Sequence, residues 1–482
     1  MALRNDTLPD NSNPLEYIRR ESLDIFNRLH SIEEDVEFVK RVHAAYKDTP
    51  FLPNLRCGAW YTDPSLATDV PAYFKSTDGH FNNWSFNLRR ANLHLLPLIL
   101  KCYGIILIDS TRAGKRIPDA LSKTVPIWCA VINRALLIRH PEQIRDREHL
   151  SWDISLYTPP VAVSMQEHHQ IELRLDRWAH VLAASSFELP VLPGPLRPLW
   201  ITPASSAFPR FPDVRAGQRE FLPVVCVSAS RQVDQGVERR TSGFSYVQGS
   251  GDDHELWGMG LTPAMFWTHR DNLLSAGRLE LPELVSAIVS QEASSFPSEI
   301  KSPTPIERVE GRVLICTLTD VPASLPHPVG LADVYVTLTP SAEPPPSNRH
   351  KLYVPVLAGK RGQAHFLRIV LPTTSRFIRE HLHNGETVCI ACESGKDLSV
   401  GVALAALQLF FRDDGTFRDL GTVSFEKDMT AKAFSKNSIR TRLEWIIASR
   451  PQANPSRATL KRVNEFLLSP PSFRTSPRVD VS

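Results

Sequence analysis

Cys392-Glu-Ser-Gly-Lys-Asp-Leu-Ser399 lies where an apolar strand expected at residues 386–392 turns into a helix expected at 400–412. A glycine-containing loop at the start of a helix points several backbone N–H groups at one place, where the helix dipole also favours an anion. Before it, residues 312–319, 333–338 and 351–356 have the apolar pattern of strands, and 365–383 that of a helix. This alternation predicts a C-terminal α/β domain over residues 308–470.

This loop resembles the phosphate loop of the cysteine phosphatases, including the dual-specificity ones, whose pattern is Cys, five residues, Arg, then Ser or Thr. Cys392 and Ser399 match it, but Leu398 stands at the arginine position. That arginine binds phosphate bidentately and stabilises the transferring group, which leucine cannot do. We therefore expect a phosphatase-like fold without hydrolysis, in which Lys396 still attracts an anion. The alternative is that Cys392 is only a small buried side chain at a strand end.

Composition limits the remaining possibilities. The chain has 482 residues, of which 42% are hydrophobic and 22% charged, so it is a globular protein too long for one ordinary core. Its net charge of +3 means that any polyanion must be met by a local patch. Seven scattered cysteines fit a reducing compartment. Without a signal pattern or an uninterrupted apolar span, we expect a cytoplasmic protein that binds no membrane, and no obligate protein partner is evident.

The Ser- and Pro-rich segment 291–307 is the expected linker between an N-terminal domain (1–290) and the C-terminal domain, which a tail (471–482) follows. In the N-terminal domain we expect a helix over 15–30 and a second helix opened by a capping box at 31–34. A strand at 104–109, a loop at 110–118 and a helix at 125–137 predict an α/β unit. Eight prolines in 189–223 predict an irregular excursion before a strand at 223–227.

The loop after the strand at 104–109 is rich in phosphate-binding side chains. Two hydroxyls, one glycine and three cations follow Asp109 within eight residues, a set that suits a phosphate or pyrophosphate. Asp109 itself would hold Mg²⁺ or stabilise a developing positive charge. The alternative is a solvated basic loop in which Asp109 caps the helix.

A second loop, 249–255, combines three carboxylates and an imidazole behind two glycines. Asp252, Asp253 and Glu255 have the chemistry of Mg²⁺ ligands, and His254 or Asp253 that of a base for a sugar hydroxyl. An ordinary acidic surface turn is the competing interpretation.

Two further regions suit RNA. Lys75, Asp78 and His80 open a polar, aromatic segment that continues through Arg89 and Arg90, a mixture typical of contacts to ribose, phosphate and stacked bases. From Lys436 to the C-terminus there are nine basic and three acidic residues, a local charge of about +6 that would attract an RNA backbone. Two helices expected at 438–449 and 456–468 carry Arg440, Arg442, Arg457, Lys461 and Arg462. Solvated helix faces are the alternative.

In this order the segments resemble the initiator-tRNA 2′-O-ribosyl phosphate transferase family of fungi and plants, over about residues 31–468. The matching stretches are Asn54-Leu-Arg-Cys-Gly-Ala-Trp-Tyr61, Phe74-Lys-Ser-Thr-Asp-Gly-His80, Ile108-Asp-Ser-Thr-Arg-Ala-Gly-Lys-Arg-Ile-Pro-Asp119, Thr124-Val-Pro-Ile-Trp128, Tyr246-Val-Gln-Gly-Ser-Gly-Asp-Asp-His-Glu255 and Gly395-Lys-Asp-Leu-Ser-Val-Gly401.

The resemblance implies an enzyme that transfers a 5-phosphoribosyl group from phosphoribosyl pyrophosphate to the 2′-hydroxyl of a T-stem adenosine of initiator tRNA, which excludes that tRNA from elongation. It also implies a family-specific N-terminal α/β domain joined to a phosphatase-like one. With that chemistry we place catalysis between the loops at 109–116 and 249–255, which must then lie together. The donor's phosphates are assigned to Ser110, Thr111, Arg112, Lys115 and Arg116, with Lys75, Asp78, His80 and Lys396 as further substrate-binding residues. An inactive phosphatase-like module that binds RNA or a phosphorylated partner is the alternative; an active phosphatase is disfavoured by Leu398.

Overall fold

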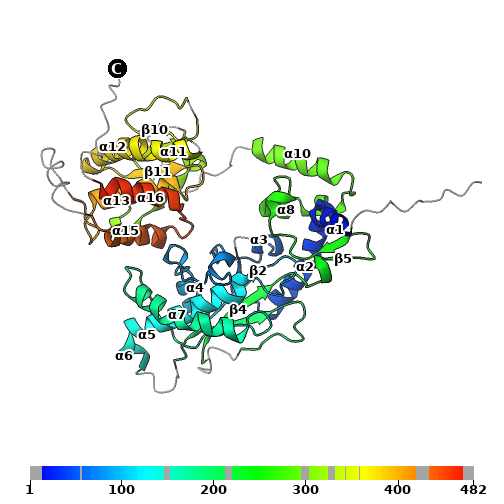
Figure 1. Cartoon of the computed structure of the whole chain (residues 1–482). Helices are drawn as coiled ribbons and strands as arrows, with labels where there is room; N and C mark the ends of the chain where they lie inside the picture. The colour runs from blue at the N-terminus through cyan, green and yellow to red at the C-terminus, as the bar shows by residue number, and fades with distance from the viewer. Residues whose placement is uncertain are drawn as a thin grey trace, which may run out of the picture. The chain divides into compact units, whose positions relative to one another are not determined.

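The computed structural model describes residues 14–54, 57–145, 152–211, 220–294, 303–323, 332–341, 343–357, 359–418 and 434–469. The chain divides between Phe296 and Pro297 into an N-terminal and a C-terminal unit, whose helices and strands are labelled in Figure 1. The C-terminal unit also includes the short segments Leu88–Arg90 and Ser185–Glu188. The division falls inside the segment expected as a linker.

A parallel four-stranded sheet forms the centre of the N-terminal unit, in the order β1-β2-β4-β3. Its strands are β1 (Phe51–Pro53), β2 (Ile105–Asp109), β4 (Leu222–Ser228) and β3 (Leu196–Ile201). The two central strands, β2 and β4, are buried along their whole length, as strands covered on both faces are. A small antiparallel pair, β5 (Val237–Arg239) and β6 (Ser245–Val247), follows β4.

Helices cover this sheet on both faces. On one face, α2 packs with alternate residues of β2 and β4, including Ile106, Ile108, Val225 and Val227, in one hydrophobic core. On the other, α5 packs against α7 and β3. The helices of the unit are α1 (Pro14–Leu23), α2 (Ile25–Ala45), α3 (Gly58–Tyr61), α4 (Leu95–Cys102), the π-helical turn η3 (Ala120–Thr124), α5 (Val125–Arg139), α6 (Pro141–Arg145), α7 (Met165–Ala183), α8 (Pro263–Thr268), α9 (Arg270–Ser275) and α10 (Leu281–Ser294), with short 3₁₀ turns at Ser76–Asp78 (η1), Asp234–Gly236 (η5) and His254–Leu256 (η6).

One continuous helical stretch of this unit, Ala120–Arg139, is long and apolar enough to cross a membrane by length and composition. Its most apolar window is 83% buried within the unit. Such burial is expected of a helix at the centre of a folded core.

Several sequence expectations for this unit are corrected by the structure. The first two helices break at Asp24, which caps α2 by accepting a hydrogen bond from the backbone N of Asn27. The capping box expected at residues 31–34 is wrong: Ser31 lies inside α2, buried, and accepts a hydrogen bond from the backbone N of Val247 at 2.8 Å. The proline-rich segment contains the edge strand β3, and an edge position tolerates Pro198 because fewer of its N–H groups must pair. At the expected linker, α10 extends to Ser294.

The C-terminal unit is built on a five-stranded sheet in the order β10-β9-β11-β8-β7, in which only the edge strand β7 is antiparallel. Its strands are β7 (Thr304–Pro305), β8 (Val313–Thr317), β9 (Val334–Thr339), β10 (Lys351–Pro355) and β11 (Val388–Cys392). The strands and the main helices expected from the sequence are confirmed. The helices are α11 (Gly359–His365), the π-helical turn η9 (Phe366–Val370), α12 (Leu371–His383), α13 (Leu398–Phe410), α15 (Lys436–Ser449) and α16 (Arg457–Leu468), with 3₁₀ turns at Leu88–Arg90 (η2), Glu307–Val309 (η7) and Leu318–Asp320 (η8).

Helix α13 is the central helix of this unit. All its residues from Ser399 to Phe410 are buried, and it packs against α12, α15, α16 and the strands β8 and β11. Because β11 leads directly into it, the loop 393–397 lies at the carboxyl end of a central strand, as the sequence predicts.

Candidate active site

Asp109 ends the central strand β2, and three segments meet at its carboxylate. Its oxygens accept hydrogen bonds from Asn54 Nδ2 and Cys57 Sγ, both at 2.7 Å, and from the backbone N of Ser110 at 2.8 Å. Asn54 also binds the backbone C=O and N–H of Phe74, at 2.7 and 2.9 Å. Three of the stretches that carry the family resemblance are thereby joined at one buried carboxylate.

This carboxylate is 1% exposed. Burial, and next the negative charge of Asp109, raise the pKa of the Cys57 thiol well above its ordinary value, so the thiol keeps its proton and donates it to Asp109. An enclosed carboxylate with these partners holds the loop in place and has no open face for a substrate. The structure therefore places Asp109 behind the site, where it cannot hold Mg²⁺ or stabilise a developing positive charge on a substrate, in contrast to the expectation from the sequence.

The loop after β2 separates its hydroxyls from its cations. Ser110 and Thr111 are buried, at 4% and 6% exposure, while Arg112 and Lys115 are exposed and Arg116 is partly exposed. The three cations are thus accessible to an anionic ligand. The hydroxyl groups of Ser110 and Thr111 are buried in the interior and are not accessible to such a ligand, in contrast to the expectation from the sequence.

The two candidate loops are held together by Gln248. Its side-chain N–H₂ donates to the backbone oxygens of Arg112 and Lys115, at 3.2 and 2.7 Å. The next residue, Gly249 (φ +69°), lies so close to the first loop that a Cβ atom there would come within 2.4 Å of the Thr111 carbonyl oxygen. The predicted adjacency of the loops at 109–116 and 249–255 is therefore confirmed.

The acidic loop does not gather its carboxylates. Asp252 is buried, whereas Asp253 (φ +48°) and Glu255 are exposed, and His254 packs on Trp60 with 5.7 Å between ring centroids. Across the described ranges no group of three or more His, Cys, Asp or Glu side chains is arranged to hold a metal ion. The three residues expected as Mg²⁺ ligands therefore do not form a metal site by themselves.

A cluster that the sequence analysis missed lies at the other end of the first loop, around Asp119. Its carboxylate oxygens lie 2.5 Å from Lys115 Nζ and 2.9 Å from Lys123 Nζ, and His80 Nε2 is 3.8 Å away. Lys123 also pairs with Glu167, at 3.1 Å. Asp119, Lys123 and Glu167 are buried, and burial alone would raise the pKa of Asp119, but hydrogen bonds from Lys115 and Lys123 hold it below its ordinary value.

The segment that carries the predicted residues Lys75, Asp78 and His80 packs next to the Asp119 cluster. Thr124 Oγ1 donates to the carbonyl of Lys75 at 3.0 Å. Lys75 and His80 are exposed, while Asp78 is buried and accepts a hydrogen bond from Ser85 Oγ at 3.3 Å. Exposed His80 and Lys115 thus both lie near Asp119, and Asp78 supports the turn between Lys75 and His80. A lysine interrupting the apolar run 120–137 was the only sequence signal for Lys123.

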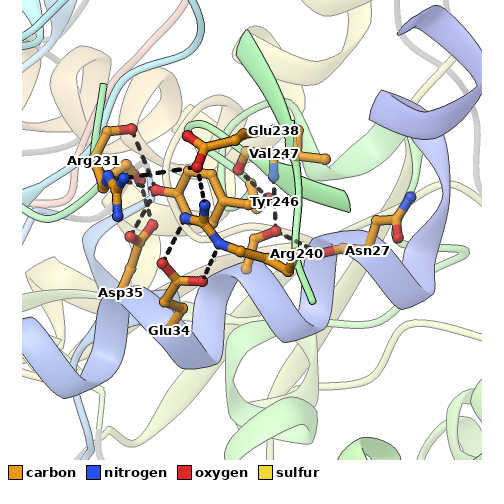
Figure 2. A network of polar contacts seen from close by, with 11 residues as sticks. Asn27, Glu34, Asp35, Arg231, Glu238, Arg240, Tyr246 and Val247 are labelled. Atoms are coloured by element: carbon orange, nitrogen blue, oxygen red, sulfur yellow. Dashed lines mark hydrogen bonds and ion pairs between the residues drawn. The ribbon is translucent and has the colours of Figure 1, made fainter. Parts of the chain in front are cut away.

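A second missed cluster centres on Asp35 of α2. Its carboxylate accepts hydrogen bonds from Ser230 Oγ at 2.6 Å and from Tyr246 OH at 2.8 Å. Figure 2 shows Asp35 reaching Tyr246 while the adjacent Glu34 pairs with Arg240. Burial raises the pKa of Asp35 to about 8, against the opposing effect of its hydrogen bonds. No sequence motif indicated this residue, which helix α2 brings to the carboxyl end of strand β4.

In the C-terminal unit, the phosphatase-like loop keeps part of its expected chemistry. Cys392 Sγ lies 3.0 Å from Ser399 Oγ, and both side chains are buried. Gly395 adopts φ +60°, and Lys396 is exposed. The thiol and hydroxyl of the resemblance are therefore in place, next to the leucine that replaces the arginine.

A different arginine supports this loop from inside. Arg450 is 7% exposed; its Nε donates to the carbonyl of Gly395 at 2.9 Å and its guanidinium also donates to Thr304 Oγ1 at 2.6 Å. The backbone N of Asn454 donates to the carbonyl of Lys396 at 2.9 Å. The segment that precedes α16 thus fixes the loop through its carbonyl oxygens, and Arg450 serves the loop backbone and not a phosphate.

The residues expected to bind RNA divide into those that line a groove and those that pair with acidic side chains. Arg457 and Lys461 line an open groove of about 720 Å³ along α15 and α16, together with Lys436. Arg89 lines the same groove within this unit, and Arg90 lies next to it in η2. The others are engaged by protein groups: Arg440 pairs with Glu444, Arg462 pairs with Glu465, and Arg442 pairs with Asp413.

Arg442 is the clear correction among these residues. It is 1% exposed, it donates to the carbonyl of Phe411, and its guanidinium lies 4.7 Å from the centroid of the Trp445 ring. A guanidinium enclosed in this way cannot meet an RNA backbone without unfolding the helix around it.

Comparison with known proteins agrees with this two-part architecture. Residues 18–290 match the family model of the Rit1 N-terminal domain, and residues 350–467 match that of the Rit1 DUSP-like domain. The chain belongs to the Rit1 family. A Schizosaccharomyces pombe protein described as uncharacterized is 34% identical over 93% of this chain and 95% of its own length. The Saccharomyces cerevisiae tRNA A64-2′-O-ribosylphosphate transferase is 31% identical over 94% of this chain and 93% of its own.

Solved phosphatase structures also match this Rit1 family member, over about a third of its length. The crystal structure of DUSP15 covers 36% of this chain and 92% of its own, with 18% identity and a TM-score of 0.25. That of human DUSP28 covers 34% and 96%, with 18% identity and a TM-score of 0.23. The DUSP-like family model over 350–467, with the sheet and loop described above, establishes the predicted fold class.

Proposed function

We propose that this chain is a pentosyltransferase that moves a 5-phosphoribosyl group from phosphoribosyl pyrophosphate to the 2′-hydroxyl of a T-stem adenosine of initiator tRNA, in the cytoplasm. The name of the Saccharomyces cerevisiae relative, which matches along almost the whole chain, supports a tRNA-modifying transferase. The observation that carries the proposal is the adjacency of the cationic loop at 110–116 and the acidic loop at 249–255. That name specifies neither the phosphoribosyl donor nor initiator tRNA, and both are part of our proposal.

The accessible side chains of these loops suit the chemistry of such a transfer. Displacing pyrophosphate from an anomeric carbon passes through an oxocarbenium-like state. Because the pyrophosphate leaves as an anion, cations must neutralise its charge. Arg112, Lys115 and Arg116 are the accessible cations on the first loop. On the second, Asp253 is exposed and His254 partly so, and these two are the candidates for accepting the proton of the 2′-hydroxyl.

Mg²⁺ belongs to the proposal as the expected companion of the pyrophosphate. Magnesium is commonly held by one or two carboxylates together with substrate phosphates and water, so it does not need a site made of three side chains. Of the predicted ligands, exposed Asp253 and Glu255 are the ones that a bound pyrophosphate could share with a metal.

The test of this function is incorporation of label. The full-length chain is incubated with Mg²⁺, phosphoribosyl pyrophosphate labelled in the ribose, and either initiator or elongator tRNA, and nuclease digestion then locates the label. We expect label on one T-stem adenosine of initiator tRNA only. A chain that binds tRNA but transfers nothing would refute the transferase and favour an inactive RNA-binding module.

A further inference from the structure

One loop of the N-terminal unit carries an exposed aromatic ring at its tip. The base of the loop is closed by Ser85, whose backbone N donates to the Asp78 carbonyl at 2.9 Å and whose Oγ donates to the Asp78 carboxylate at 3.3 Å. At the tip, the backbone N of Asn83 donates to the His80 carbonyl at 2.9 Å. This turn holds Phe81, which is 61% exposed. The ring is therefore presented to solvent by a loop whose backbone is hydrogen-bonded at both its base and its tip.

The buried Trp84 supports this ring. The two rings meet edge to face with 5.5 Å between their centroids, and Trp84 Nε1 donates to Glu167 Oε1 of α7 at 2.9 Å. The exposed Arg174, also on α7, places its guanidinium 4.9 Å from the centroid of the Trp84 ring. An exposed aromatic ring and an exposed cation are thus both packed on one buried tryptophan.

The same loop lies against the cationic loop that follows β2. Gly79 packs so closely there that a Cβ atom would come within 2.7 Å of the Asp119 carbonyl oxygen. His80 Nε2 is 3.8 Å from the Asp119 carboxylate, which also binds Lys115. Because Phe81 follows His80 directly, the turn that carries its ring lies next to residues assigned to the donor's phosphates.

We propose that Phe81 is a stacking platform for a nucleobase of the tRNA acceptor. Proteins hold unstacked RNA bases on aromatic side chains, because every base has a π-face, and meet the adjoining phosphates with cations. Arg174 supplies that positive charge beside Trp84. A single exposed apolar side chain means little by itself, but the hydrogen-bonded turn, the arginine and the neighbouring donor loop distinguish this one. The inference rests on the proposed function, because it names the part of the tRNA that is held next to the donor.

The decisive pair of variants is Phe81→Ala, which removes the ring, and Phe81→Tyr, which keeps it. Binding of initiator tRNA to the full-length chain is measured by filter binding at salt concentrations from about 50 to 200 mM. For Phe81→Ala we expect the dissociation constant to rise about tenfold at every salt concentration, because stacking contributes affinity of that order and the ring carries no charge. Phe81→Tyr should stay within about twofold of wild type, since it retains the π-face.

Two further variants separate stacking from charge and from exposure. Arg174→Gln should flatten the salt dependence by about one unit of slope, as the loss of a phosphate contact does. Tyr17→Ala is the matched control: Tyr17 is also an exposed aromatic residue beside an arginine, with the Arg20 guanidinium 5.6 Å from its ring centroid. It lies on α1, which packs against α2, β5 and β6, and its replacement should leave tRNA binding as in wild type.

The outcomes distinguish this inference from the proposed function. A Phe81→Ala variant that binds tRNA as tightly as wild type would overturn the platform, as would an equal loss of affinity in Phe81→Tyr or Tyr17→Ala. Binding of phosphoribosyl pyrophosphate with Mg²⁺, measured by calorimetry without tRNA, should be unchanged in Phe81→Ala. A wild type that binds tRNA but transfers no label would overturn the transferase, and the binding comparison would still decide the role of Phe81. A wild type that binds no tRNA would overturn both.

Discussion

Replacing Lys123 by Met tests whether the Asp119 cluster is a buried scaffold or a surface feature. Methionine keeps the length and the apolar stem of lysine but removes the ammonium that lies 2.9 Å from Asp119 and 3.1 Å from Glu167. All three side chains are at most 10% exposed. The substitution therefore leaves two carboxylates buried without their shared cation.

The magnitude follows from that burial. Breaking a buried ion pair by removing one partner typically costs about 3–5 kcal/mol, because an uncompensated charge stays behind. Lys115→Met provides the contrast on the same carboxylate. Its side chain is 49% exposed although it lies 2.5 Å from Asp119, and an exposed pair contributes only about 0–1 kcal/mol.

The measurement is urea unfolding of both variants at pH 7, with a second series at acid pH. Asp119 has a folded-state pKa below its unfolded value of about 3.9, so its contribution to stability is present above that value and is lost as the pH falls through the folded pKa. Lys123→Met should remove part of the lowering of the Asp119 pKa, since Lys123 is one of the two lysines that cause it. The gap in unfolding free energy between wild type and Lys123→Met is therefore expected to narrow below about pH 4.

Two outcomes would refute this reasoning. One is a Lys123→Met variant no less stable than Lys115→Met, which would mean that water or a moved side chain compensates the two acids. The other is a difference in unfolding free energy between wild type and Lys123→Met that stays constant below about pH 4. Adding Glu167→Gln to Lys123→Met offers an internal check, since removing one orphaned charge should restore about half of the loss.

Three further predictions address the other sites. Cys392→Ser should leave ribosyl transfer within about threefold of wild type, because Leu398 cannot assist a thiolate; a loss beyond about a hundredfold, typical of a missing catalytic group, would give the thiol a chemical role. Replacing Lys436, Arg457 and Lys461 with Ala should weaken tRNA binding and flatten its salt dependence by about two to three units of slope, with turnover at saturating tRNA retained; the charge-matched variant at the exposed residues Arg361, Arg368 and Arg376, none of which lines the groove, should bind as wild type. Asp253→Asn should slow transfer by about a hundredfold without weakening tRNA binding, and a change confined to tRNA affinity would count against its role as a base.

Much of the fold could be predicted because its signals are local. The buried strands β2, β4, β8, β9 and β11 are runs of branched apolar residues, and the segments between them have helical spacing. The strands β1 and β3 were missed because they are edge strands containing Pro53 and Pro198, and proline normally argues against a strand. The helix break moved from Ser31 to Asp24 because tertiary packing, and not the local capping pattern, uses the Ser31 hydroxyl.

The candidate site was predictable only in outline. Motif chemistry placed the loops at 109–116 and 249–255 together, since both follow β-strands that turn out to belong to one unit. It could not tell which polar residues point inward. Asp35 and Lys123 belong to no motif, and they reach their partners through the packing of α2 and the turn η3 on the sheet. Such long-range contacts leave no spacing in the sequence.

Some charged residues of both units are buried and bonded to protein groups, whereas others are exposed at the surface. Asp109, Arg442 and Arg450 have the right chemistry for ligands, yet each is enclosed and bonded to protein groups, where a charge is kept only if its partners stay fixed. Lys115 and Arg112 stand at the surface of the same loop that Asp109 holds. Lys115 already pairs with Asp119 there, so a pyrophosphate that binds must draw this ammonium away from a carboxylate. Donor affinity is therefore expected to depend on Asp119 as well as on Lys115: Asp119→Asn should release the lysine and tighten donor binding, whereas Lys115→Ala should weaken it.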